Sequence, residues 1–284
     1  MMNKVIYLLI LVAIYSCHSP EQKQSIKNSS MKDSVYHEST KNLHWIAALE
    51  KAPYLKKSER LTNDDLYECV SKKFLNGEFV IDSLENKARK HLKLELITKD
   101  EFINERKNTI SYLISDIEIF PKKNGITTLP FPGGNAQYVD VNPELASMRE
   151  FYYRGHYNNP DLYLMYVQYY EAGCSYWLID KSDSGRKADF PSLPIFTPDK
   201  KTIISVAFDP YSDSHCELKL CSINGSIITK VFQAEFVNWA PSAEEQGYMS
   251  SEGSFRIPII NSKFVWTREG GLNKNYQYLK ISIL

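Results

Sequence analysis

The segment from Tyr152 to Tyr157 holds the side chains of this chain that are best suited to recognise a ligand. Arg154 and His156 could together hold an anion or a carboxylate, and tyrosine and arginine dominate the hot spots of binding surfaces. A loop that is simply packed by its tyrosines is the competing interpretation. The candidate contact surface consists of Tyr152, Tyr153, Arg154, His156 and Tyr157.

Carboxylates are the second group of residues that could do chemistry. Glycosidases use a pair of Asp or Glu residues that flank the bond to be cleaved. The residues that could supply such a pair are Glu171, Asp209, Asp213 and Glu235. Nothing in their spacing brings two of them together, and each is also typical of a turn or of the rim of a site.

The sequence indicates no metal, cofactor or catalytic site. Its six histidines form no pair at metal-ligand spacing, and no nucleophile elbow, phosphate-binding loop or dinucleotide fingerprint occurs. Residues 180–185 begin with the oxygen spacing of a calcium loop at Asp180, but the twelfth position is Pro191, which cannot bind calcium. A polar hairpin turn is the better interpretation of this segment.

Cys17 carries the clearest signal about where the protein resides. It follows Lys4, a short apolar run over residues 5–15 and Ser16, an order typical of a secretory signal peptide. The apolar run is too short to cross a bilayer comfortably. An ordinary signal peptide with an incidental cysteine is the alternative.

Residues 14–17, Ile-Tyr-Ser-Cys, resemble the lipobox of bacterial lipoproteins, from which Tyr15 departs because a small residue is usual there. The resemblance implies cleavage before Cys17, lipid attachment to Cys17, and localisation in the cell envelope at the outer membrane, facing the periplasm. Several acyl chains at one site anchor a protein firmly. The membrane, reached through this lipid, is therefore one expected partner.

The other four cysteines show no zinc-site spacing. Cys216 and Cys221 are five residues apart, so on one strand they point to opposite faces and should not bond each other. We expect mostly free, buried thiols, with one disulfide left open as an alternative among Cys69, Cys174, Cys216 and Cys221.

Charge and composition describe an ordinary globular protein. The chain has 34 basic and 34 acidic residues among 284, and no long basic block. A nucleic-acid partner is therefore not expected. No later apolar run is long enough to span a membrane.

The chain divides into four parts on composition. Residues 1–16 form the predicted signal peptide, and residues 17–41 form a lipidated cysteine with a polar tether. Residues 42–120 show three- and four-residue apolar spacing and are predicted to form a helical layer. Its helices are expected near residues 43–49, 62–76, 80–92 and 98–117, the last with a capping box at Thr98 and Glu101.

Residues 121–284 form a predicted β-rich domain, because Gly and Pro separate short aromatic and β-branched runs. Residues 162–170 and 175–180 are expected to pair as a hairpin. Residues 202–208 and 217–223 form a similar predicted pair. Further strands are predicted over residues 227–237, 263–267 and 276–283.

A weak internal repeat runs through this domain. Ile195-Phe-Thr-Pro-Asp corresponds to Asn238-Trp-Ala-Pro-Ser, and the two prolines, Pro198 and Pro241, lie 43 residues apart (241 − 198). The first copy resembles the turn of WD40-like and TolB-type propeller repeats, although Lys200 replaces the usual Gly. A period near 40–45 residues is typical of a propeller blade.

The expected fold class is therefore α+β, with a helical N-terminal layer and an antiparallel β-domain of propeller-like repeats. That domain could be a partial propeller or a β-sandwich. The expected function is a lipid-anchored, non-enzymatic module that binds a protein or glycan, with an immunity or inhibitor protein as a variant. The alternative is a periplasmic hydrolase that acts on envelope polymers.

Overall fold

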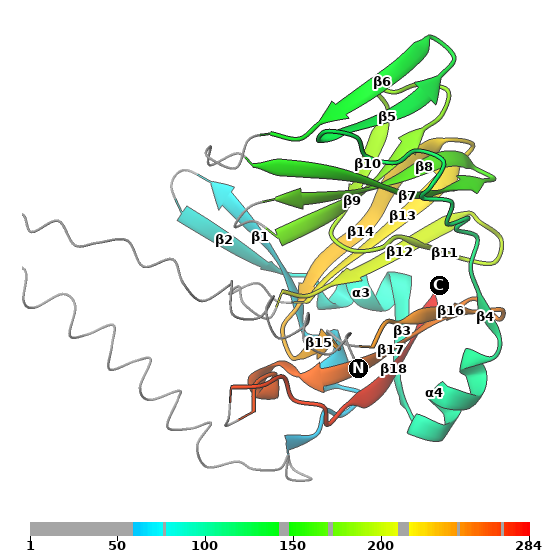
Figure 1. Ribbon diagram of the computed structural model, residues 1–284. Coiled ribbons are helices and arrows are strands. Elements are labelled where there is room, and N and C mark those ends of the chain that lie inside the picture. Colours follow the sequence, from blue (N-terminus) through cyan, green and yellow to red (C-terminus); the bar gives the residue numbers. More distant parts are fainter. Residues whose placement is uncertain are drawn as a thin grey trace, which may run out of the picture. The chain divides into compact units, whose positions relative to one another are not determined.

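The computed structural model describes most of residues 59–284, and within these residues the chain is mainly antiparallel strands with two α-helices (Figure 1). The predicted signal peptide, Cys17, the tether and the helix at residues 43–49 lie outside the described part. The gaps in the description are residues 76–77, 142–147, 170–172, 210–215, 243–244 and 268–269.

Six strands form the long sheet, in the order β11-β12-β13-β14-β1-β2. Four of them follow one another along the chain, whereas β1 and β2 come from the N-terminal part and add to the outer side of β14. The bounds are β1 (Cys69–Leu75), β2 (Glu78–Ser83), β11 (Ile195–Phe196), β12 (Thr202–Ala207), β13 (Cys216–Asn224) and β14 (Ile227–Phe236).

Four consecutive strands form the meander sheet, in the order β10-β9-β8-β7, and a separate hairpin joins β5 to β6. Successive side chains along these strands point to opposite faces of the sheet, and both faces pack into the core. The bounds are β5 (Ile126–Phe131), β6 (Gly134–Val139), β7 (Arg149–Asn158), β8 (Asp161–Tyr169), β9 (Gly173–Asp180) and β10 (Lys187–Phe190).

The C-terminal sheet has the order β3-β18-β17-β16-β4, and β15 also pairs with β17. It too joins distant parts of the chain, because β3 and β4 precede the other strands by more than 100 residues. The bounds are β3 (Leu92–Ile97), β4 (Thr109–Ile110), β15 (Trp239–Pro241), β16 (Tyr248–Ser250), β17 (Ser254–Asn261) and β18 (Gln277–Ile283). The described helices are η2 (Asp65–Tyr67), α3 (Glu85–His91), α4 (Lys99–Arg106) and η3 (Ser262–Phe264).

Three apolar clusters hold these sheets together. The first joins the long sheet to the C-terminal sheet, for example through Leu218 and Ile257. The second packs the β5–β6 hairpin on the meander sheet, with Leu129 against Trp177 and its neighbours. The third joins the other face of the meander sheet to the long sheet, where Leu178 meets Ile203.

The prediction of a helical N-terminal layer is wrong for the described residues. Residues 69–75 and 78–83, where the spacing predicted helix, form β1 and β2 instead. Cys69 pairs with Phe236 of β14, so strand pairing to a distant segment overrides a local helical spacing. Helix does occur in α3 and in α4, where the Thr98 side chain caps the Glu101 amide at 3.1 Å, but α4 ends at Arg106.

The prediction of propeller-like repeats is also wrong, since the sheets do not close into a ring of four-stranded blades. Phe196 and Trp239 are both buried, as expected, but they are not equivalent. Phe196 pairs with Ile203 at the edge of the long sheet, whereas Trp239 pairs with Asn261 in the C-terminal sheet. The repeated Pro-containing segment is a local similarity that does not extend to the pairing of strands.

The expected β-hairpins are confirmed. Strand β8 pairs with β9, and β12 pairs with β13, in antiparallel register. The predicted strand at residues 263–267 is wrong, because residues 262–264 form η3. All four described cysteines are free, and Cys216 and Cys221 face different apolar clusters on the two sides of β13, as predicted.

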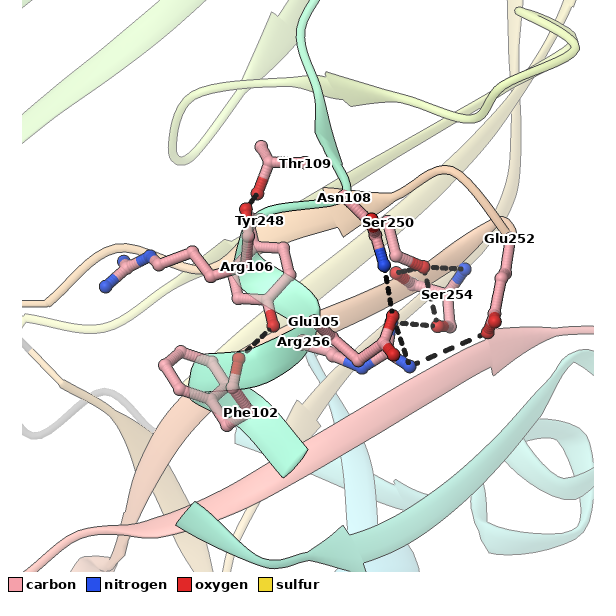
Figure 2. Close-up of polar contacts among 10 residues, drawn as sticks. All are labelled: Phe102, Glu105, Arg106, Asn108, Thr109, Tyr248, Ser250, Glu252, Ser254 and Arg256. Atoms are coloured by element: carbon pink, nitrogen blue, oxygen red, sulfur yellow. Dashed lines mark hydrogen bonds and ion pairs between the residues drawn. The ribbon is translucent and has the colours of Figure 1, made fainter. Parts of the chain in front are cut away.

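A buried arginine ties α4 to the turn between β16 and β17 (Figure 2). Only 2% of Arg256 is exposed, and its guanidinium donates to the Ser254 hydroxyl at 2.8 Å. Glu105 of α4 lies 3.9 Å from it and Glu252 lies 3.7 Å from it. Nearby, the Tyr248 hydroxyl donates to the backbone carbonyl of Phe102 in the middle of α4. These contacts hold α4 in place, which matters because few of its side chains are buried.

Candidate functional site

Three connected hollows border residues 191–195, the segment that links β10 to β11. The inner hollow, of about 200 Å³, and the central hollow, of about 310 Å³, share Leu193 and Ile195. The central hollow and the outer hollow, of about 430 Å³, share Cys174 and Pro191. Because each hollow shares lining residues with the next, the three adjoin one another, and we call them together the groove.

Hydrogen bonds hold residues 191–195 in place above the sheets. The Ser192 amide donates to the Ser205 hydroxyl at 3.1 Å, which attaches the segment to β12. The Tyr157 hydroxyl of β7 donates to the Pro194 carbonyl at 3.2 Å. Polar contacts from both neighbouring sheets therefore define the wall between the inner and outer parts of the groove.

The central hollow is mainly apolar and lies at an open edge of the long sheet. Strand β11 pairs with β12 only at Ile203 and Ile204. Within the described residues, no strand lies on the outer side of β12 at Val206 and Ala207. The apolar lining consists of Tyr176, Leu193, Ile195, Val206, Phe208 and Ile257.

The outer hollow carries charge. Asp189 of β10 lines one side of it, and Glu217, Lys219 and Gln233 of the long sheet line the other. The Lys219 ammonium donates to the backbone carbonyl of Asp189. This hollow is therefore a polar continuation of the apolar one.

Glu217 is the most perturbed carboxylate of the groove. Burial raises its pKa, and the nearby charges of Glu235 and Asp189 raise it further, while a hydrogen bond from Gln233 and the charge of Lys219 act in the opposite direction. The Gln233 amide donates to the Glu217 carboxylate at 2.5 Å. Within the described residues, no cation lies within ion-pair distance of this carboxylate.

Glu217 and Glu235 are cross-strand partners on β13 and β14. Directly opposed residues place their Cβ atoms about 4.5 to 5.5 Å apart. Lys72 of β1 forms an ion pair with Glu235 at 2.8 Å. The two carboxylates are therefore neighbours with different partners: one is bound to a lysine and the other to an amide.

Cys174 stands where the central and outer hollows meet, and it is the exposed cysteine of the described part. Burial raises the pKa of its neighbour Tyr166 to about 12, and the charge of Cys174 and a hydrogen bond from the Tyr166 hydroxyl to Cys174 act in the same direction. The Tyr166 ring packs at an angle between Tyr152 and Tyr176, whose ring centroids lie 6.1 and 5.2 Å away. An aromatic row therefore leads from the groove to the edge strand β7.

The predicted contact surface proves to be strand β7 rather than a loop, and its side chains are divided. Tyr152 and Arg154 share the face of the aromatic row, where Arg154 lies 5.0 Å from the centroid of the Tyr166 ring. Tyr153 and Tyr157 are buried on opposite faces of the sheet, in two different apolar clusters. Only part of the predicted set can thus reach a ligand together.

His156 belongs to a separate cluster. Its Nδ1 lies 3.0 Å from the Asp116 carboxylate, and the Tyr153 hydroxyl donates to the same carboxylate at 2.7 Å. Burial acts to raise the pKa of Asp116, but the hydrogen bonds from Tyr153 and His156 outweigh it and leave the pKa lowered. The pair ties residues 111–120 to β7, and none of the groove's hollows is lined by it.

The other carboxylates named from the sequence do not gather. Asp209 lies beyond the end of β12, and Glu171 and Asp213 lie outside the described residues. The Asp180 carboxylate accepts from the Ser182 amide at 2.9 Å and pairs with Arg186 at 3.1 Å, which describes a polar turn. No group of three or more metal-ligating side chains occurs in the part of the chain that the structure describes.

Sequence reasoning missed Glu217 and the groove itself. The alternation of Cys216–Asn224 could have placed Glu217 and Lys219 on the polar side of a strand. The position of Asp189 and Cys174 opposite them depends on how two sheets pack, which no local pattern encodes.

Comparisons with models of protein families, with curated proteins and with solved structures return no match to this chain. Among the described residues, no helix has the length and apolar character needed to cross a bilayer. In the part of the chain that the structure describes, the strands pair antiparallel, and the groove lies between an open sheet edge and a charged hollow.

Proposed function

We propose that this chain is a lipid-anchored protein of the cell envelope that binds a protein or glycan in the groove without converting it. The observation that carries the proposal is the adjacency of the three hollows, whose lining changes from apolar in the central hollow to charged in the outer one. A lining that changes from apolar to charged along its length suits an extended ligand. The lipobox-like segment at Cys17 supports the anchor and the periplasmic location.

The test is to trap the ligand in living cells. A photo-crosslinking amino acid, p-benzoylphenylalanine, replaces Cys174 at the junction of two hollows. A matched reporter replaces Ile103, which is exposed on α4 and lines none of the three hollows. We expect a crosslinked species from the groove position that is missing from the control position.

A groove-filling variant completes this experiment. Ala207 is half-buried beside the open edge of β12, so Ala207→Trp should fill the central hollow and leave the fold intact. Ile103→Trp is the matched surface control. If Ala207→Trp leaves the crosslinked species unchanged, or if no species forms at all, the groove is not the binding site.

The opposed pair Glu217 and Glu235 favours one alternative, a hydrolase that acts on envelope polymers. Retaining glycosidases place their two carboxyl groups about 5 to 5.5 Å apart, and direct cross-strand opposition makes Glu217 and Glu235 neighbours on one face of the sheet. Against this role, Glu235 is engaged by Lys72. Release of reducing ends from purified peptidoglycan, lost in Glu217→Gln and in Glu235→Gln, would establish the alternative and overturn the non-enzymatic proposal.

A further inference from the structure

Building on the proposed function, we propose that the ligand is an extended polypeptide segment that adds to the open edge of β12. It places an apolar side chain in the central hollow and an adjacent lysine or arginine beside Glu217. The class of ligand is thus a protein with an exposed, basic and apolar strand-like segment, rather than a glycan or a lipid.

The open edge of β12 is the first argument for a polypeptide. An edge strand presents unpaired N–H and C=O groups, and an extended peptide satisfies them by adding a strand. Strand β11 occupies this edge only as far as Ile204, and the next residue, Ser205, is bound to Ser192. Among the described residues, the edge at Val206 and Ala207 then borders the central hollow, so an added strand would lie inside the groove.

The lining of the central hollow is the second argument. Leu193, Val206 and Ile257 offer aliphatic surface, which favours an apolar side chain. The polar lining residues are Ser192, Ser242, Glu245 and Gln246, of which Glu245 is paired with Arg106. A sugar ring would also bring hydroxyl groups against the aliphatic part, where burial without a partner is unfavourable. The hollow therefore favours a hydrocarbon side chain over a glycan.

Charge complementarity is the third argument, and it specifies a basic side chain. The charged groups around the outer hollow are Asp189, Glu217, Glu235, Lys219 and Lys72, three acidic and two basic. Lys72 is bound to Glu235, and the Lys219 ammonium is bound to a backbone carbonyl. Glu217 is left half-buried without a cation, a state that an incoming ammonium or guanidinium group would relieve.

The geometry of a strand assigns the apolar side chain and the basic side chain to adjacent residues of the ligand. Successive side chains of a strand point to opposite faces. Val206 faces the cluster that contains Ile257, whereas Ala207 lies directly opposite Glu217 on the other face. Ala207 has only a methyl group, so a long basic side chain of the added strand could pass over it and reach Glu217.

The test uses a random dodecapeptide display library, panned against the full-length lipoprotein in detergent micelles and counter-selected on Ala207→Trp. We expect enriched sequences in which a lysine or arginine adjoins an aliphatic or aromatic residue. Fluorescence anisotropy then measures the affinity of the most enriched peptide. Loss of one charge-assisted hydrogen bond should weaken binding by about tenfold or more in Glu217→Gln.

Matched variants separate charge from folding. Glu78→Gln removes an exposed acid on β2 and should leave the affinity unchanged. Replacing the basic peptide residue by norleucine should weaken binding to the wild-type protein, and Glu217→Gln should then cause no further loss, as expected for a directly interacting pair.

Enrichment without basic residues, no enrichment over Ala207→Trp, or equal affinity for Glu217→Gln would overturn the inference. Those results would leave the proposed function standing if the crosslinker at position 174 still traps a ligand in cells. A glycan trapped there would also overturn the polypeptide inference alone, whereas the absence of any trapped species contradicts the proposed function.

Discussion

At the scale of single residues, His156 was predicted to contact a ligand, but in the structure its side chain pairs with Asp116. His156 and Tyr153 both direct their side chains to Asp116, and Tyr153 also packs edge-to-face on Phe120. A cluster of this kind stabilises a crossing of two segments. It explains why a stretch rich in tyrosine, arginine and histidine need not be exposed to a partner.

Asp116→Asn should lower the free energy of unfolding by about 1 to 3 kcal/mol at neutral pH, because charge-assisted hydrogen bonds are lost. The folded pKa of Asp116 is lowered, so its contribution is present above the unfolded pKa of about 3.9 and disappears as the pH falls through the folded pKa. Urea unfolding of wild type and variant at pH 7 and in strong acid measures this. A difference that persists in acid would contradict the charge-based explanation.

Gly155→Ala should be strongly destabilising. Gly155 has φ of 136°, and an added Cβ would lie 2.2 Å from the Ile114 carbonyl oxygen. Gly134→Ala is the matched control, because Gly134 has φ of 121° but open space around its Cα. The control should lose about 1 to 3 kcal/mol through backbone strain, and Gly155→Ala should lose clearly more in a thermal unfolding experiment. Equal losses of stability in the two variants would show that the backbone at Ile114 can move away from the added methyl group.

At the scale of elements, the hairpins of the C-terminal half could be predicted from sequence, whereas the N-terminal strands could not. Runs such as β8 and β9 are contiguous, alternate regularly and pair with their neighbours in the chain. Strands β1 and β3 pair with β14 and β18, about 165 to 190 residues away. Their local spacing fits either a helix or a strand, and only the distant partner decides between them.

The candidate site was less predictable than the fold for the same reason. Glu235 was named as a carboxylate of interest, but its partner Glu217 was not. Cross-strand registry placed the two side by side, and sheet packing brought Asp189 and Cys174 opposite them. The strand register and the sheet packing depend on elements that are distant in sequence, so the spacing of residues within one element does not predict them.

Trp239→Ala should cost about 3 to 5 kcal/mol, because a fully buried indole is replaced by a cavity. The indole Nε1 also donates to the Leu66 carbonyl at 3.1 Å, which ties η2 to β15. Trp239→Phe keeps most of the ring but loses this bond, so it should be destabilised by less. Denaturant unfolding of both variants separates packing from hydrogen bonding, and a loss below 1 kcal/mol in Trp239→Ala would contradict the burial.

At the scale of the whole molecule, the proposed anchor predicts where the protein fractionates. Cys17→Ser removes the proposed acceptor of the lipid, so the protein should leave the membrane fraction or remain as an uncleaved precursor. Ser16→Ala is the matched control, since alanine is also a small residue before the cysteine. Membrane fractionation with mass measurement of the N-terminus provides the readout. A fully processed Cys17→Ser protein that stays in the membrane would refute the lipoprotein assignment.

The pairing of β18 with β3 has a consequence for when this chain can fold. Strand β18 ends at Ile283, and the Leu284 amide donates to the His91 carbonyl at 2.9 Å. The C-terminal sheet is therefore incomplete until β18, about 180 residues after β3, has left the ribosome. Folding dominated by such remote contacts is slow. We therefore expect β3 to remain unpaired during most of synthesis and the sheet to form only after β18 is complete.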